Sequence, residues 1–299
     1  FCRNEGNSEI CSKMNFFKFR KIPLAWLLLS RQPLRLLVAI AGISFAGILM
    51  FMQIGFRDGL FDTSVTIHNL LDADLVLISP RSKSSISMSG FPKRRLIQAL
   101  AQNEVKSISP VNLNYLLWRN PENLKTRSIL ALGFNPNDSI LLDKEFSQKA
   151  NLLKNPGRVL FDSLSRPEFG PVEEWFKSGR KVQTEVAGKR VLVEGLVELG
   201  PSFGADGNLI TSTETYLKLF PANPKGSIEI GLVKLMANSD SKKVSQILNK
   251  SLPNDVRVLT KDEFIEFEKN YWKTSTAIGF IFSLGAFMGF IVGCVVVYQ

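Results

Sequence analysis

Two long uncharged runs stand out in the pattern of hydrophobic and polar positions along the chain. The first lies between Arg35 and Arg57 and holds 21 residues, and the second follows Lys273. At ~1.5 Å per residue a helix of the first run is about 31 Å long, which matches the ~30 Å hydrocarbon core of a bilayer. The pattern therefore predicts transmembrane helices at 34–56 and 274–298.

A buried core helix and a cleaved signal peptide are the alternatives to a retained span. Core helices rarely run past ~14 apolar residues without a charge, and the apolar part of a signal peptide covers ~7–15 residues. The first run is longer than both, and the residues after it, GFRDGLFD, lack a small-residue cleavage pattern. We interpret it as a retained anchor.

The basic residues orient this anchor. Seven Lys and Arg but only two Glu occur up to and including Arg35, whereas four Asp follow the first run by Asp74. The positive-inside rule then predicts a cytoplasmic N-terminus. It puts residues 57–273 outside the inner (plasma) membrane, as a periplasmic domain.

The residues before the first span divide into two segments. Residues 1–13 are polar and precede the first methionine, Met14, so we expect an unstructured or non-native extension. Residues 14–33 interleave aromatic and basic side chains. This is typical of an amphipathic helix in the cytoplasmic-side interface, with Trp26 at headgroup depth. A plain basic flank that only orients the span is the alternative.

The outer domain begins with alternating helical and strand patterns. Helical spacing continues after the first run to about residue 70, and the segment PKRRLIQALAQ has Leu96, Ile97 and Leu100 on one helical face. The predicted βαββ run has a strand, a helix and two strands, at 73–79, 92–102, 105–118 and 126–133.

A second βαβ unit is predicted near the end of the domain. SIEIGLVKL and DVRVLT have strand patterns, and between them SKKVSQILNKSL presents Val244, Ile247 and Leu248 on one helical face. Two βαβ units in one domain favour a ferredoxin-like sheet.

Residues 155–220, between these units, are rich in short strands. A hairpin is predicted there, turning near Ala187 and Gly188. We interpret this segment as an inserted, mostly-β subdomain. The predicted fold class is therefore a membrane protein with two transmembrane α-helices flanking a large α+β periplasmic domain, built of ferredoxin-like βαβ units and this insert.

The helix before the second run has its own start signal. Thr260 and Glu263 have the spacing of a capping box. We expect this helix to run from Lys261 without a break into the second span, with Tyr271 and Trp272 in the aromatic belt at the outer membrane–water interface.

Small residues recur within both runs. Gly285, Gly289 and Gly293 occupy every fourth position of the second run, and Gly42 and Ala46 have the same spacing in the first. Small residues at this spacing let helices pack closely in lipid, although glycine is also commoner in membrane helices in general. We predict that these five residues line helix–helix contacts. Neither run contains a charge, so no intramembrane proton relay or ion path is expected.

Charge and cysteine content narrow the class of protein. Half of the net charge of +10 precedes the first run, where it orients the helix and meets anionic lipid, so it is no nucleic-acid signature. The three cysteines, Cys2, Cys11 and Cys294, lie outside the predicted domain. That domain must therefore fold on its hydrophobic core without disulfides.

Candidate chemistry is sparse. His68 is the only histidine, and no cysteine shares its compartment, so we expect a structural or surface role rather than a zinc site. The sequence contains no G-x-x-x-x-G-K-[ST] motif, which excludes a P-loop ATPase on this chain. We predict no catalytic residue, no metal site and no bound cofactor.

The segment IPLAWLLLSRQPLRLLVAIAGISFAGILMFMQIGFRDGLFDTSVTIHNLLDADLVLISPRS resembles the start of DevC-type permeases. These are the membrane subunits of cyanobacterial ABC exporters for envelope glycolipid. The resemblance continues through ALGFNPND and SFGADGNLITS and covers most of the chain after Met14. The MacB and FtsX permeases are the wider relatives.

This resemblance implies a homodimer of four-span subunits, each with a large periplasmic domain between its first two spans. It also implies a separate ABC ATPase, a periplasmic membrane-fusion adaptor and an outer-membrane channel as partners. The third and fourth spans and the cytoplasmic loop that would dock the ATPase are missing from the sequence. We therefore expect a chain truncated after the second span, which does not export by itself.

Two functions remain open at this point. The favoured one is the permease subunit of an ATP-driven exporter, embedded in membrane lipid and without nucleic-acid binding. The alternative is a membrane-anchored sensor with a periplasmic ligand-binding domain. Further spans downstream indicate the permease, whereas a cytoplasmic signalling module indicates the sensor.

Overall fold

A computed structural model describes residues 31–142 and 144–298 of the chain. The predicted extension at 1–13 and the predicted interfacial position of Trp26 lie outside these described residues.

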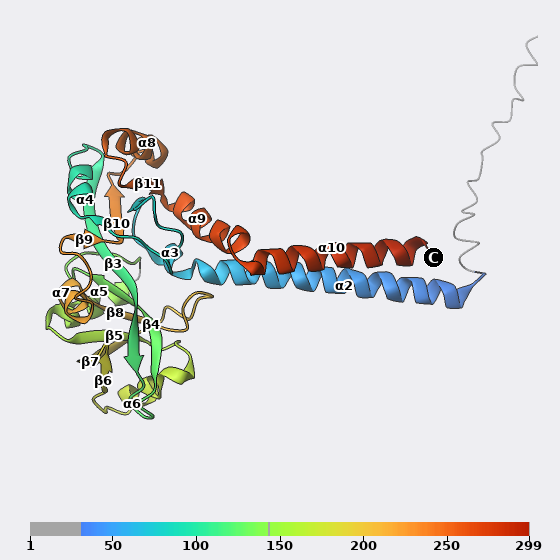
Figure 1. Ribbon diagram of the computed structural model, residues 1–299, viewed down its shortest axis with the longest axis horizontal. Helices are drawn as coiled ribbons and strands as arrows, with labels where there is room; N and C mark the ends of the chain where they lie inside the picture. Colours follow the sequence, from blue (N-terminus) through green and yellow to red (C-terminus); the bar gives the residue numbers. More distant parts are fainter. Residues whose placement is uncertain (1–30, 143, 299) are drawn as a thin grey trace, which may run out of the picture. The chain divides into compact units, whose positions relative to one another are not determined.

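The chain divides into two compact units. The described residues of the first, here called the helical unit, are 31–51 and 287–298, and the second, the larger unit, is Met52–Ala286. Helix α2 (Pro33–Ser64) and helix α10 (Ala277–Tyr298) contribute residues to both. In the helical unit these two helices lie side by side (Figure 1).

Small residues of α10 face α2 in the helical unit. A Cβ at Gly293 would lie 4.0 Å from the Cβ of Ala46, and a Cβ at Gly289 would lie 3.9 Å from the Cε of Met50. These are ordinary van der Waals distances. Gly293 therefore faces Ala46, and Gly289 faces the end of the Met50 side chain.

Gly285 also faces α2, within the larger unit, and its contact is much closer. The amide side chain of Gln53 lies directly against it, so that a Cβ at Gly285 would come within 1.7 Å of the Gln53 Nε2. Gly42, the remaining small residue of the predicted set, lies one turn before Ala46 on α2.

Helix α2 is long and apolar enough to cross a membrane. A second candidate span requires α9 (Lys261–Thr274) and α10 together, and these two helices bend by 65° at the break between them. The prediction of one unbroken helix from Lys261 into the second run is therefore wrong.

A hydroxyl side chain and a glycine account for this break. The Thr276 hydroxyl donates to the carbonyl oxygen of Trp272 at 2.6 Å, and such back-bonding bends helices. The carbonyl oxygen of Lys273 lies 1.9 Å from the point where a Cβ of Gly279 would stand. Only glycine permits that approach, because it has no side chain.

The larger unit is built on a nine-stranded sheet with the order β11-β1-β10-β3-β4-β8-β5-β7-β6. In the first four strands every neighbouring pair is antiparallel. The connections β1–α4–β3 and β10–α8–β11 supply the two predicted βαβ units. The bounds are Leu75–Ile78 for β1, Arg94–Ala99 for α4, Val105–Arg119 for β3, Ile230–Leu235 for β10, Ser241–Ser251 for α8 and Arg257–Thr260 for β11.

The inserted strands close onto β3 as a ring. Strands β3, β4, β8, β5, β7 and β6 follow one another in the sheet, and β6 pairs back to β3 through Val186 and Trp118. This closure pairs the edge strand β6, which would otherwise offer unpaired backbone groups. The bounds are Thr126–Phe134 for β4, Arg158–Asp162 for β5, Gln183–Val186 for β6, Lys189–Val197 for β7 and Asn208–Ser212 for β8.

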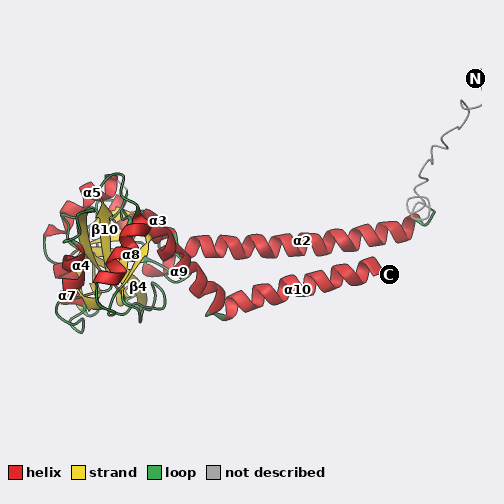
Figure 2. Cartoon of the chain, turned by 90° about the horizontal axis from the view of Figure 1, so that it is seen from above, coloured by secondary structure: helices red, strands yellow, loops and turns green. Residues whose placement is uncertain are grey.

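The shorter elements connect these strands and cover the sheet, so that helices surround the strands of the larger unit (Figure 2). They are α3 (Thr66–Leu70), β2 (Phe91–Pro92), α5 (Lys144–Ala150), α6 (Val172–Lys177), α7 (Thr213–Leu219), β9 (Ser227–Ile228) and the 3-10 helices Asn151–Lys154 and Pro167–Phe169.

Strand β1 is buried on both faces. Leu77 belongs to the core cluster that contains Leu96 of α4 and Leu248 of α8. Val76, on the opposite face, belongs to the cluster that contains Phe264 of α9. The strand therefore lies in the middle of a three-layer arrangement, which explains its unbroken run of apolar residues.

Two predicted helix faces are partly wrong. Ile97, Leu100 and Ile247, which the apolar pattern predicts to be buried, are 55%, 43% and 42% exposed. Helix α4 instead buries Leu96 and Ala99. A short helix on one face of a sheet buries a stripe narrower than its apolar pattern.

Two local predictions are confirmed. Strands β6 and β7 turn at Ala187 and Gly188, whose φ angles of 50° and 74° fit a type I′ turn. Thr260 caps α9 in a complete capping box with Glu263.

A disulfide tests the contact between α2 and α10. In a full-length background without native cysteines, we expect Ala46→Cys and Gly293→Cys to cross-link on mild oxidation. Their Cβ separation of 4.0 Å lies within the ~3.5–4.5 Å that disulfides require. Loss of maleimide-reactive thiols measures the reaction. Phe45→Cys paired with Gly293→Cys is the control, since Phe45 is 63% exposed, and equal oxidation of both pairs would contradict the contact.

Candidate functional site at the junction of helices and sheet

Helices α3 and α9 meet the sheet at one place, here called the junction. The junction comprises α3 and the starts of β1 and α9. Strands β1 and β11 pair antiparallel with Leu75 opposite Thr260. Leu75 is the first residue of β1, and Thr260 is the N-cap of α9. Because paired strands lie ~4.8 Å apart, the segments that follow α2 and precede α10 meet the sheet side by side.

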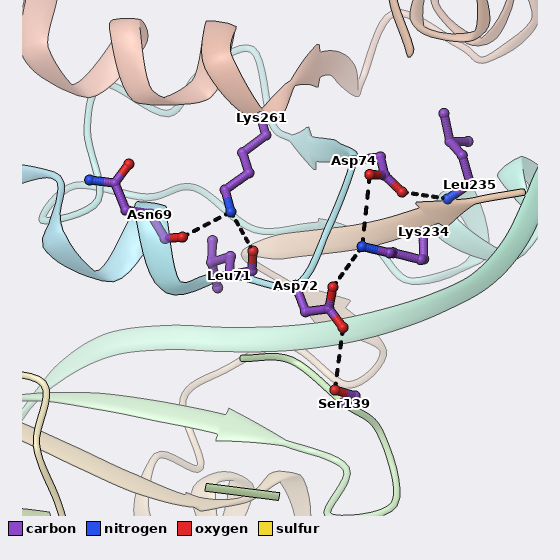
Figure 3. Close-up of polar contacts among 8 residues, drawn as sticks. All are labelled: Asn69, Leu71, Asp72, Asp74, Ser139, Lys234, Leu235 and Lys261. Atoms are coloured by element: carbon purple, nitrogen blue, oxygen red, sulfur yellow. Dashed lines mark hydrogen bonds and ion pairs between the residues drawn. The ribbon is translucent and has the colours of Figure 1, made fainter. Parts of the chain in front are cut away.

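Lys261 joins α9 to α3 (Figure 3). Its ammonium group donates to the carbonyl oxygens of Asn69 at 2.9 Å and Leu71 at 2.7 Å. These carbonyls lie at the C-terminal end of α3, where unpaired carbonyl groups favour a cation. Burial lowers the pKa of Lys261, and the charge of Lys234 lowers it further.

Lys234 on β10 holds the link between α3 and β1. Its Nζ lies 2.7 Å from Asp72 Oδ1 and 3.8 Å from Asp74 Oδ1, and the hydrogen bond to Asp72 raises the pKa of Lys234. Asp74 Oδ2 accepts from the backbone N–H of Leu235 at 2.8 Å, and Asp72 Oδ2 accepts from the Ser139 hydroxyl at 3.4 Å (Figure 3). The link is therefore tied both to β10 and to the loop after β4.

A second polar cluster is buried between α3, α9 and the loop that follows β1. Ser85 donates to Glu268 Oε2 from its backbone N–H at 2.7 Å and from its hydroxyl at 2.9 Å. The Ser85 Oγ lies 2.7 Å from His68 Nε2, and the Trp272 indole N–H donates to Glu268 Oε1 at 2.9 Å. His68 and Glu268 are 4% and 1% exposed. The buried cluster joins three segments that lie far apart in the sequence.

The hydrogen bonds assign the protons of this cluster. Because the Ser85 hydroxyl hydrogen goes to Glu268, His68 donates from Nε2, and its Nδ1 carries no hydrogen. That nitrogen has no partner among the described groups. Burial lowers the pKa of His68 to about 4 and raises the pKa of Glu268. Tyr115 is the other titratable group near Glu268, and burial raises its pKa.

The order of these groups differs from that of a serine hydrolase. In a catalytic triad the carboxylate binds the histidine Nδ1, while Nε2 takes the proton of the serine. Here Glu268 Oε2 lies 3.7 Å from His68 Nε2, on the same side as Ser85, and the serine hydroxyl is bound to the carboxylate. The arrangement fixes the serine instead of activating it, so we assign the buried cluster a structural role.

A cavity of about 30 Å³ adjoins the buried cluster. His68, Ser85 and Glu268 line it together with apolar side chains such as Leu113 and Phe264. A water molecule needs ~10–15 Å³ in this measure, so the cavity has room for water and is too small for a larger ligand. No group of three or more potential metal ligands occurs in the described part of the chain.

The two aromatic residues predicted for the membrane interface, Tyr271 and Trp272, differ in their burial. Tyr271 is partly buried. Trp272 is 6% exposed and packs edge-on against Phe203, with 4.6 Å between the ring centroids. The Trp272 ring is thus covered by the domain itself.

The sequence pattern did contain one signal for the buried cluster. Phe264, Glu268 and Trp272 recur at every fourth position and share the buried face of α9. A carboxylate in the middle of an apolar helix face indicates a buried partner. The identity of that partner, Ser85, depends on a loop whose path the sequence does not reveal.

Acid should destabilise the protein through His68. Its pKa of about 4 in the folded state lies below the ~6.5 of an unfolded chain. Its contribution is therefore fully present above pH 6.5 and is lost as the pH falls towards 4, by up to about 3 kcal/mol. Glu268 acts oppositely, because its raised pKa contributes stability at low pH that is lost as the pH rises.

We expect His68→Gln, whose amide can keep the bond to Ser85, to lose less stability than the wild type between pH 6.5 and 4. Urea titrations of the detergent-solubilised protein measure this. Glu268→Gln removes the opposing contribution and should steepen the loss. Parallel stability curves for the wild type and His68→Gln would show that the histidine is not the titrating group.

Comparison of the sequence with family models finds no match, and comparison with curated proteins finds none. Among solved structures, the chain is similar to the periplasmic region of MacB from Actinobacillus actinomycetemcomitans, with 12% identity and a TM-score of 0.44 over 68% of this chain and 96% of that one. It is also similar to the extracellular domain of the noncanonic ABC-type transporter YknZ from Gram-positive bacteria, with 13% identity and a TM-score of 0.42 over 62% of this chain and 99% of that one.

Proposed function

We propose that this chain is the permease subunit of an ATP-driven ABC exporter of the MacB/FtsX-like group. In this proposal α2 and α10 span the inner membrane, the N-terminus is cytoplasmic and residues 57–273 are periplasmic. Support comes from the resemblance of its sequence to DevC-type permeases, from the two uncharged runs and from the basic residues before the first run.

The junction is the observation that carries the proposal. Lys261 ties the start of α9 to the end of α3, and Leu75 and Thr260 are opposite each other in the sheet. A relative movement of the two helices must therefore act on neighbouring strands of one packed domain. Packed cores transmit such displacements because they do not deform continuously.

The energy for this movement would come from a separate chain. The sequence contains no P-loop motif, so the permease is a non-catalytic transport subunit and ATP hydrolysis belongs to a partner ATPase. A homodimer, a periplasmic membrane-fusion adaptor and an outer-membrane channel complete the proposed assembly. Envelope glycolipid is the proposed cargo, on the DevC-type resemblance alone.

A sensor is the second candidate, and one feature favours it. An open groove of about 730 Å³ is lined by residues of α5, of the 3-10 helix Asn151–Lys154, of α6 and of β7. Phe146, Phe176 and Leu196 contribute apolar surface to the groove, and Glu173 and Lys177 also line it. A groove of this volume is large enough for a small ligand.

Purification of the full-length protein from its native membranes distinguishes the two candidates. We expect an ABC ATPase to co-purify in a fixed ratio with the tagged permease. Co-purification of a signalling kinase without an ATPase would contradict the permease assignment and favour the sensor.

Lys261→Met should impair export without loss of the ATPase. The substitution removes the two hydrogen bonds from α9 to α3. In the proposed topology position 261 is periplasmic, on the opposite side of the membrane from the ATPase. We expect reduced envelope glycolipid in a deletion strain complemented with this variant, measured by lipid chromatography. Lys242→Met, at an exposed position on α8, is the matched control. Export at wild-type level by both variants would contradict a coupling role for the junction.

A further inference from the structure

An exposed aromatic ring stands at the tip of the loop between β7 and β8. Phe203 is 40% exposed. The segment from Leu199 to Ala205 contains no charged residue. Single exposed apolar side chains are common on protein surfaces. An exposed phenylalanine indicates a binding surface only where the loop that carries it is held in place.

The first half of the loop is fixed by a fully buried carboxylate. Asp162 Oδ1 accepts from the backbone N–H groups of Leu199 at 3.0 Å and Gly200 at 3.2 Å. The Asn208 side chain donates to Asp162 Oδ2 at 2.7 Å and to the Gly200 carbonyl at 2.9 Å. Asp162 is 0% exposed, so these bonds are shielded from competing water.

The second half is fixed by charges and by a tyrosine. Arg127 lies 2.6 Å from Asp206 Oδ2, and Arg166 lies 2.9 Å from Asp206 Oδ1. The Tyr115 hydroxyl donates to the Gly204 carbonyl. The loop therefore holds Phe203 in one place, and little conformational entropy is left to lose when a partner binds it.

The position of the ring indicates the partner. Phe203 packs at 85° against Trp272, with 4.6 Å between centroids. Trp272 lies five residues before Ala277, where the uncharged helix α10 begins. A residue beside the last turn of α9 is at the level where the chain would enter the membrane, and aromatic side chains are favoured at that level.

We propose that the tip of this loop, residues 201–204, rests on the headgroup region of the bilayer with Phe203 inserted into it. This gives the domain a membrane contact separate from its two helices, and it assigns to Phe203 the interfacial position that Trp272, covered by the domain, does not fill. The inference rests on the membrane-spanning role of α10 in the proposed function. Its partner is the lipid interface, not a second protein.

Spin labelling of the full-length protein in phosphatidylcholine–phosphatidylglycerol nanodiscs tests the proposal. With the native cysteines replaced by serine, a nitroxide is attached at Phe203→Cys and its accessibility to oxygen and to a water-soluble nickel chelate is measured. We expect an oxygen-to-nickel ratio several-fold above that of a label at Leu217→Cys. Leu217 on α7 is a matched control with 38% exposure, and α7 lies at the opposite end of the larger unit from α9 (Figure 1).

The other outcomes overturn the proposal. A label at residue 203 with the aqueous ratio of residue 217 shows a loop in water, and a label shielded from both reagents shows a protein contact. Phe287→Cys, at a position 60% exposed on α10, reports in the same discs whether that helix is in lipid. Lipid accessibility at residue 287 but not at 203 refutes only this inference, whereas aqueous accessibility at 287 refutes the proposed function as well.

Discussion

The antiparallel pairing of β1 with β11 is the constraint on which the junction depends. It sets Leu75 opposite Thr260. Thr260 is the N-cap of α9, and Leu75 comes five residues after the end of α3. Backbone pairing is specific to one register, since a slip of one residue would turn every side chain of β1 to the other face. With both faces of β1 buried, such a slip would expose or crowd a core cluster on each side.

Polar groups reinforce this backbone geometry in two different dielectric environments. The Lys234–Asp72–Asp74 contacts are partly exposed, so each is worth at most about 1 kcal/mol and they act mainly by fixing direction. The Ser85–His68–Glu268 contacts are buried. A buried polar group without a hydrogen bond lowers the stability of the fold by more than one hydrogen bond raises it. Removing one member of the buried cluster should therefore cost more than removing one exposed partner. This asymmetry favours a single arrangement of α3, α9 and the loop after β1.

Segment 155–220 contributes to the same region. Its strands close onto β3 through Trp118 and Val186, so the ring is continuous with the sheet that carries the junction. Its loop between β7 and β8 reaches back to Trp272 of α9. The sheet at the junction and segment 155–220 thus both contact α9, and a displacement of α9 would act on both.

The sequence by itself determined the elements whose signals are local. The capping box of Thr260 and Glu263 and the turn at Ala187 and Gly188 were predictable because each depends on neighbouring residues. The βαβ units were predictable because helix and strand impose different apolar periods. The uncharged runs were evident from their length alone.

Only the tertiary structure decided which distant residues meet. Ser85 lies in a serine-rich loop and Glu268 on a helix near the other end of the chain, and no local pattern relates them. The break between α9 and α10 likewise depends on the approach of the Lys273 carbonyl to Gly279, which a composition without charge or proline does not predict. Likewise, only the tertiary structure decides that the exposed aromatic side chain beside α9 is Phe203 and that Trp272 is buried. Side-chain exposure is set by what packs on a residue, and the sequence specifies that packing only through the whole fold.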